Sequence, residues 1–171
     1  MLLTTTRFGE IDVPENHCLA FPQGIPGFPE EKSFAFLPYE PDNVFAFLQS
    51  ATDPDLTFVI VNPFAFFPDY DVALHTDIVG AIGIAPENPG EIWNIVTVRT
   101  GGTEMTANLL APIVINWLDR KAMQVVLEKT PYTTRHHLIP PKTEAEAQAI
   151  EAKMNAAPQV AEAQAAPDDA V

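Results

Sequence analysis

The side chains able to bind a metal or to transfer protons are few in this sequence. Its histidines are His17, His75, His136 and His137. None belongs to an H-E-x-x-H or C-x-x-C pattern, or to the H-x-H with a following glutamate that holds the metal of a cupin. Adjacent side chains of a strand point to opposite faces, so His136 and His137 cannot bind one metal together. We therefore expect neither a metal site nor a cofactor.

Carboxylate pairs and the single cysteine give no sign of catalysis either. Asp53 with Asp55, and Asp69 with Asp71, lie in expected turns, where acidic side chains are common because they hydrogen-bond the local backbone. Nothing in their spacing marks a general acid and base. Cys18 would need a base beside it to act as a nucleophile, and we expect it to be a packing residue. These residues indicate a protein that is not an enzyme.

The stretch that organises the predicted fold covers residues 106–116, with the sequence T-A-N-L-L-A-P-I-V-I-N. Alternate positions from 105 to 115 are all apolar, whereas Thr106, Asn108 and Asn116 fall on the other set, which is the pattern of a half-buried strand. Pro112 cannot donate to a strand ladder, so we expect the strand to be bent or split there. Residues 117–121, whose charged centre should face water, then form a hairpin connection to a second strand at 122–127.

The remaining strands are short and separated by turns. They are expected at 4–13 (one or two strands), 17–21, 34–38, 44–49, 56–61 and 92–99, with Gly101 and Gly102 closing a hairpin before 106–116. The apolar run 56–61 predicts a central strand buried on both faces. Such a series favours an all-β fold, and we expect a small closed antiparallel β-barrel because closure leaves no edge strand.

Helices are predicted in two places only. Within 71–84, Thr76 or Asp77 could cap a short helix that Gly83 ends. At 143–154, Thr143 and Glu146 form a capping box, and the Ala-, Gln- and Pro-rich residues from 158 onward are typical of disorder. No aromatic residue follows Tyr132, so we place one barrel domain at 1–139 and a helical, then disordered tail at 140–171.

Composition limits the partners. The 171 residues carry a formal net charge of −14, with 9 Lys and Arg against 23 Asp and Glu. This charge opposes nucleic acids and anionic membranes, whose binding depends on basic side chains. No stretch has the length of a membrane span, and the first residues lack the pattern of a signal peptide. We expect a cytoplasmic monomer that attracts a basic protein partner.

Two segments are open to a structural or a partner-binding interpretation. Residues 22–29 hold Pro and Gly at a density that dictates turns, and they form either a rigid structural loop or a contact loop. The aromatic residues between 64 and 70 form either core, a lid over a barrel end, or an exposed patch for a partner.

Several blocks of this chain resemble the family of flagellar assembly factor FliW. They are F-P-Q-G-I-P-G-F at 21–28, F-A-F-L-Q-S at 45–50, F-V-I-V-N-P at 58–63, I-V-T-V at 95–98, A-N-L-L-A-P-I-V-I-N at 107–116 and Q-V-V-L at 124–127, with Tyr132, Arg135 and His136. The block at 107–116 is the most specific. The resemblance covers residues 7–139 and excludes the tail.

The resemblance implies a small β-barrel that binds flagellin and the basic translational regulator CsrA, keeping CsrA from flagellin mRNA. Free flagellin would then compete for the barrel and release CsrA. The alternative is a small-molecule-binding or metal-dependent barrel enzyme, with Phe64, Phe66 and Phe67 lining the barrel mouth.

The contact residues do not follow from either interpretation. Polar residues inside apolar strands and the turn-rich loop are the candidates for partner binding: Gly24, Gly27, Phe28, Asn62, Asn108 and Asn116. Each asparagine has an equally good explanation as the cap of a turn or bulge.

Overall fold

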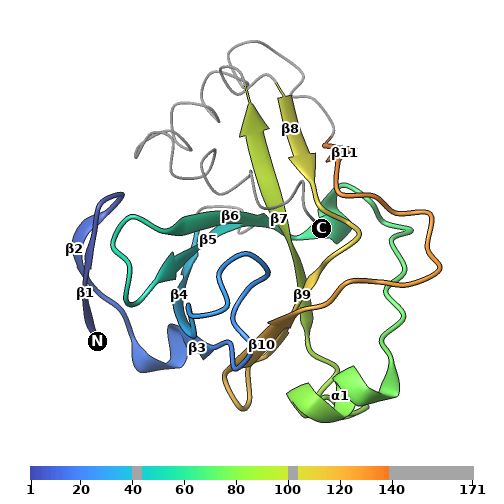
Figure 1. Ribbon diagram of the computed structural model, residues 1–171, viewed down its shortest axis with the longest axis horizontal. Helices are drawn as coiled ribbons and strands as arrows, with labels where there is room; N and C mark the ends of the chain where they lie inside the picture. Colours follow the sequence, from blue (N-terminus) through green and yellow to red (C-terminus); the bar gives the residue numbers. More distant parts are fainter. Residues whose placement is uncertain (40–43, 100–103, 139–171) are drawn as a thin grey trace.

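The computed structural model describes residues 1–39, 44–99 and 104–138 (Figure 1). The strands are β1 (Leu2–Thr5), β2 (Gly9–Asp12), β3 (Cys18–Ala20), β4 (Ser33–Pro38), β5 (Phe45–Ser50), β6 (Thr57–Val61), β7 (Glu91–Arg99), β8 (Glu104–Ala107), β9 (Ile113–Asn116), β10 (Lys121–Gln124) and β11 (His136–His137). The helices are α1 (Thr76–Ile82) and the short 3-10 turns η1 (Glu15–His17) and η2 (Pro63–Ala65).

The central sheet closes into a barrel. Its strands follow the order β7-β6-β5-β4-β3-β10-β9, and β9 pairs back onto β7 through Trp93 and Ile113 (Figure 1). Neighbours are antiparallel except β3 and β10, which pair in parallel at Ala20 and Lys121. Beyond the β9 pairing, the rest of β7 extends out of the ring and pairs with β8, which pairs with β11. The predicted closed barrel is confirmed.

One face of the ring strands fills the interior of the barrel. Phe34, Phe58 and Ile60 are among the side chains buried there. The loop between β3 and β4 adds Phe21 and Ile25 to the same cluster, so it plugs one end of the barrel (Figure 1). Because side chains alternate along a strand, the interior accounts for only half of each strand.

The outward-facing side chains are covered by three satellite clusters. Tyr70, Leu109 and Leu138 belong to the cluster that includes Val59 and Val96 of β6 and β7. Helix α1 packs outside β9 and β10, where Ile82 meets Val114 and Met123. The β1–β2 hairpin covers part of β4 with Leu3 and Val13 beside Ala35. β6 is accordingly buried at every position, as its apolar run predicted.

The split at Pro112 is confirmed. β8 ends at Ala107 and β9 begins at Ile113. The intervening carbonyls still accept hydrogen bonds, from Val125 N–H to the Pro112 carbonyl at 2.8 Å and from Leu127 N–H to the Leu110 carbonyl at 2.8 Å. The chain therefore leaves the ladder of β8 and re-enters the barrel as β9, paired with β10 in the predicted hairpin.

The start of α1 was predicted one residue or more too late. His75, not Thr76 or Asp77, is the N-cap, and its Nδ1 accepts a hydrogen bond from the Asp77 N–H at 3.2 Å. A ring nitrogen of a neutral imidazole serves as the acceptor that Ser, Thr or Asp usually supplies. Gly83 ends the helix as predicted, with φ of 78° in the left-handed region that glycine adopts without strain.

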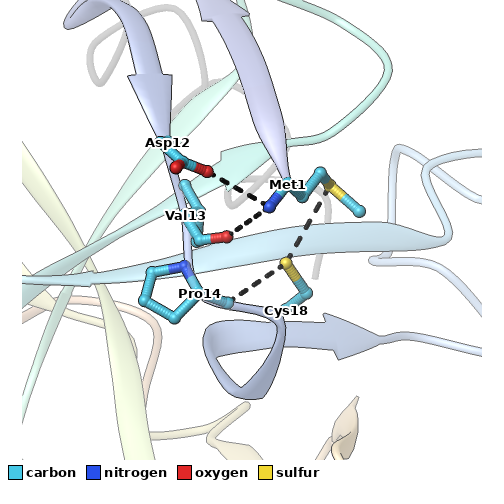
Figure 2. Close-up of polar contacts among 5 residues, drawn as sticks. All are labelled: Met1, Asp12, Val13, Pro14 and Cys18. Atoms are coloured by element: carbon cyan, nitrogen blue, oxygen red, sulfur yellow. Dashed lines mark hydrogen bonds and ion pairs between the residues drawn. The ribbon is translucent and has the colours of Figure 1, made fainter.

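Cys18 lies beside the N-terminal hairpin (Figure 2). Its Sγ is 3.7 Å from the Pro14 carbonyl oxygen and 4.0 Å from the Met1 sulfur. The Met1 amino group donates to the Val13 carbonyl at 2.7 Å and to the Asp12 carboxylate at 3.3 Å. Neither neighbour of Cys18 is a base, and the residue packs against the cluster formed by the hairpin and β4.

Some sequence predictions lie outside the described residues. These are the turn at Gly101 and Gly102, the helix at 143–154 and the remainder of the tail at 140–171. Within the described ranges, no helix combines the length and the apolar character that crossing a bilayer requires.

Candidate partner-binding site

The end of the barrel opposite the plugging loop carries an open groove of about 840 Å³. Strand directions explain its position: β3 begins after His17, β4 ends at Pro38, β7 begins at Glu91 and β9 ends before Trp117. The antiparallel registers bring these points to one end of the ring. The lining residues are Asn16, His17, Phe36, Pro38, Asn62, Phe64, Gly90, Glu91, Ile92, Trp93 and Trp117. We refer to this feature as the mouth groove.

The polar centre of the mouth groove is the Glu91 carboxylate. Its Oε1 accepts hydrogen bonds from the indole N–H groups of Trp93 at 2.5 Å and Trp117 at 3.2 Å. Trp93 lies in β7 and Trp117 directly follows β9, so the β7–β9 pairing that closes the barrel places both indoles beside the same oxygen. The carboxylate is thus held in one orientation at the surface.

The aromatic rings of the groove pack against one another. The ring of Phe36 packs edge-on against Trp93 at a centroid distance of 5.2 Å and against Trp117 at 5.0 Å. Trp93 is buried, Trp117 is half-buried, and Phe64 is 45% exposed. The groove therefore has a rigid aromatic floor and an exposed aromatic rim, a composition typical of sites that anchor another protein.

Of the six predicted contact residues, Asn62 alone lines this groove. Its Oδ1 accepts a hydrogen bond from the Phe64 N–H at 3.1 Å, which caps η2. The same residue therefore shapes the backbone that presents the exposed Phe64 ring. A direct contact between Asn62 and a partner stays a prediction.

Asn108 and Asn116 are buried and have structural roles. The Asn108 Oδ1 accepts a hydrogen bond from the Ala111 N–H at 3.1 Å, at the turn that precedes Pro112. The Asn116 Nδ2 donates to the Ile82 carbonyl at 2.7 Å and joins the end of α1 to β9. These hydrogen bonds agree with the alternative that each asparagine stabilises a turn or a segment end. Both side chains are buried, so a partner could contact them only if the structure changed.

The loop residues Gly24, Gly27 and Phe28 lie at the plugged end, away from the mouth groove. Gly24 has φ of 68°, and a Cβ there would lie 2.6 Å from the Pro29 carbonyl oxygen. The half-buried Phe28 ring packs edge-on against Phe58 at 5.6 Å. Gly27 is exposed. The loop has a structural role as the plug, and only its exposed side is accessible to a partner.

The expected aromatic mouth is only partly right. Phe64 lines the groove, whereas Phe66 and Phe67 pack against the outer cluster that contains Tyr70 and Leu109. Sequence reasoning missed Glu91, Trp93 and Trp117. The feature of the sequence that could have indicated this site is its two tryptophans, because tryptophan is enriched where proteins bind one another.

The histidines are dispersed. His17 lines the mouth groove and His75 caps α1. His136 accepts a hydrogen bond at Nε2 from the Thr133 N–H at 2.8 Å, and burial lowers its pKa. Across the described parts of the chain, no three His, Cys, Asp or Glu side chains converge on a point that could hold a metal ion.

Comparison with known proteins gives consistent matches. The family model described as FliW protein matches residues 2–138. The flagellar assembly factor FliW of Heliobacterium modesticaldum is 54% identical over 147 residues, covering 86% of this chain and 96% of that protein. The Desulfitobacterium hafniense protein of the same name is 44% identical over 148 residues, covering 86% and 95%. A crystal structure of the flagellar assembly factor FliW aligns with a TM-score of 0.75 and 40% identity, covering 84% of this chain and all of that one.

Proposed function

This chain belongs to the FliW family of flagellar assembly factors, and from that premise we propose that it binds flagellin and the translational regulator CsrA. Bound CsrA is kept from flagellin mRNA, and free flagellin displaces CsrA by competing for the barrel. The level of unexported flagellin thereby controls its own translation. The family match is the observation that carries this proposal.

The charge of the chain supports a basic partner. A formal net charge of −14 attracts a protein whose basic surface binds RNA, and it repels the phosphates of that RNA. Repulsion acts over roughly 8–10 Å at physiological ionic strength, so the barrel does not need to cover the whole RNA site to weaken RNA binding. The same charge opposes direct binding of nucleic acid or anionic membrane by the barrel itself.

The proposed partners indicate the compartment in which the protein acts and the stoichiometry of its complexes. Because CsrA acts on messenger RNA and flagellin is captured before export, we propose that the protein acts in the cytoplasm. We propose that it is a monomer in isolation and that one barrel binds one partner at a time. The tail at 140–171 is outside the family match.

A barrel enzyme is not favoured. The relatives are named as assembly factors, and the mouth groove presents one carboxylate that already accepts two indole N–H groups. Stoichiometric metal in the purified protein, or turnover of a small molecule, would favour the enzyme instead.

Binding and competition with purified proteins test the proposal. Size-exclusion chromatography is expected to give a complex of the full chain with CsrA, and a separate complex with flagellin. Adding the chain is expected to release flagellin leader RNA from CsrA, and adding flagellin to restore the CsrA–RNA complex. By linkage, saturating RNA must weaken CsrA binding to the chain by the same factor. Absence of both complexes overturns the proposal.

A further inference from the structure

We propose that the mouth groove is the site where a basic polypeptide partner inserts an arginine side chain, with its guanidinium group on the Glu91 carboxylate. The inference rests on the proposed function in one respect, since it takes the ligand to be a protein. It adds the surface, the residue type and the anchoring group, none of which follows from family membership.

The electrostatics of the groove select a cation. Among its lining residues Glu91 is the one with a permanent charge, and no lysine or arginine lies among them. The hydrogen bonds from Trp93 and Trp117 both end on Oε1. A carboxylate has about four acceptor positions on its two oxygens, so Oε2 can still accept from a partner. The groove therefore offers an oriented negative group within a strongly acidic protein.

The aromatic walls select arginine over lysine. A planar guanidinium packs against aromatic rings and donates to a carboxylate at the same time, whereas an ammonium group is a compact point charge that holds its water. Here the half-buried Trp117 and the exposed Phe64 line the groove that also holds Glu91. An arginine stem lying along these rings would bury their exposed apolar surface and bring its head group to the carboxylate.

The rim indicates a macromolecular partner and not a small metabolite. Phe64, which lines the groove, is 45% exposed. Leu118 is outside the lining but directly follows the lining residue Trp117, and it is 79% exposed. Exposed apolar side chains around a fixed polar centre are the usual composition of a protein contact surface. We therefore expect the arginine to come from a segment with an apolar neighbour that covers this rim.

The two tryptophans provide a selective signal. The chain has two tryptophans and both line the mouth groove, so its tryptophan emission reports on this one place. The double variant W93F/W117F has no tryptophan, so the tryptophan emission of its mixture with a partner comes from the partner alone. Binding of CsrA to the full chain is expected to change the tryptophan signal, and binding of a partner elsewhere is not.

The variant Glu91→Gln tests the charge. A glutamine Oε1 still accepts from both indoles, so the groove keeps its shape while losing its charge. Affinity for CsrA is expected to fall about fivefold or more, since a charge-assisted hydrogen bond is roughly twice as strong as a neutral one. Glu10→Gln is the matched control, because Glu10 is an exposed carboxylate on β2 and outside the groove. It changes the net charge equally and is expected to leave affinity within about twofold after salt screening.

Two peptides test the groove without either protein partner. Acetyl-Phe-Arg-Phe-amide is expected to perturb the tryptophan emission at millimolar concentration, and the citrulline peptide, which has the same shape without the charge, is not. Equal responses to the two peptides overturn the inference. So do equal CsrA affinities for Glu91→Gln and Glu10→Gln, or a loss of affinity confined to flagellin. If neither protein binds the chain, the proposed function fails, and the peptide pair still decides whether the groove takes arginine.

Discussion

Replacing Asn116 by alanine is expected to destabilise the barrel strongly. The side chain is fully buried. Its Nδ2 donates to the Ile82 carbonyl at 2.7 Å and to the Asp119 carboxylate at 3.0 Å, and its Oδ1 accepts from Asn88 Nδ2 at 2.8 Å and from the Asp119 N–H at 3.1 Å. One residue thus joins the end of α1, the turn at Asn88 and the β9–β10 hairpin.

The magnitude follows from these four contacts. Each is worth about 1 kcal/mol net, and the exposed residue Asp119 recovers some hydration, so we expect a loss of about 3 kcal/mol. For a domain of this size that lowers Tm by roughly 6–12 °C. Asn116→Asp is expected to cost at least as much, because a carboxylate cannot donate to Ile82 and would face the Asp119 carboxylate.

Urea unfolding followed by tryptophan emission and by far-ultraviolet circular dichroism measures the loss. Asn62→Ala is the matched control, since its side chain supplies one capping bond, to the Phe64 N–H, worth about 1 kcal/mol. CsrA affinity, corrected for the folded fraction, is expected to be unchanged in Asn116→Ala. A stability loss no larger than that of Asn62→Ala would refute the structural role assigned to Asn116.

Two further predictions concern backbone strain and pH. Gly24→Ala is expected to lower the free energy of unfolding by about 2 kcal/mol or more, because φ is 68° and the added Cβ meets the Pro29 carbonyl at 2.6 Å. Gly9→Ala, with φ of 71° and open space around it, is expected to cost about 1 kcal/mol, and equal losses in urea unfolding contradict the steric argument. Burial raises the pKa of Tyr70 to about 12, above its unfolded value of about 10. The contribution of Tyr70 to the free energy of unfolding is therefore complete below about pH 10 and is lost as the pH rises to about 12. In Tyr70→Phe the urea midpoint is expected to fall less steeply between about pH 10 and 12 than in the unchanged protein. A tyrosinate titration completed near pH 10 for all three tyrosines would contradict the raised pKa of Tyr70.

Local patterns in the sequence were enough to predict most of the elements. Period-2 alternation located β9, and the apolar run at 56–61 predicted the burial of β6 on both faces. Pro112 marked the split between β8 and β9 because it lacks an N–H group. Gly83 marked the end of α1. These features depend on the chemistry of one short segment, so the segment itself contains the information.

The mouth groove depends on contacts between distant parts of the chain. Glu91 and Trp93 begin one strand and Trp117 follows another, and only the pairing of β7 with β9 brings the two indoles to one carboxylate. The parallel contact of β3 with β10 likewise arises from closure of the ring. The sequence determined the strands, the acidic charge and the resemblance to a family. Tertiary structure decided which polar residues are buried caps and which line the mouth groove, because burial and register are properties of the closed barrel and not of any single segment.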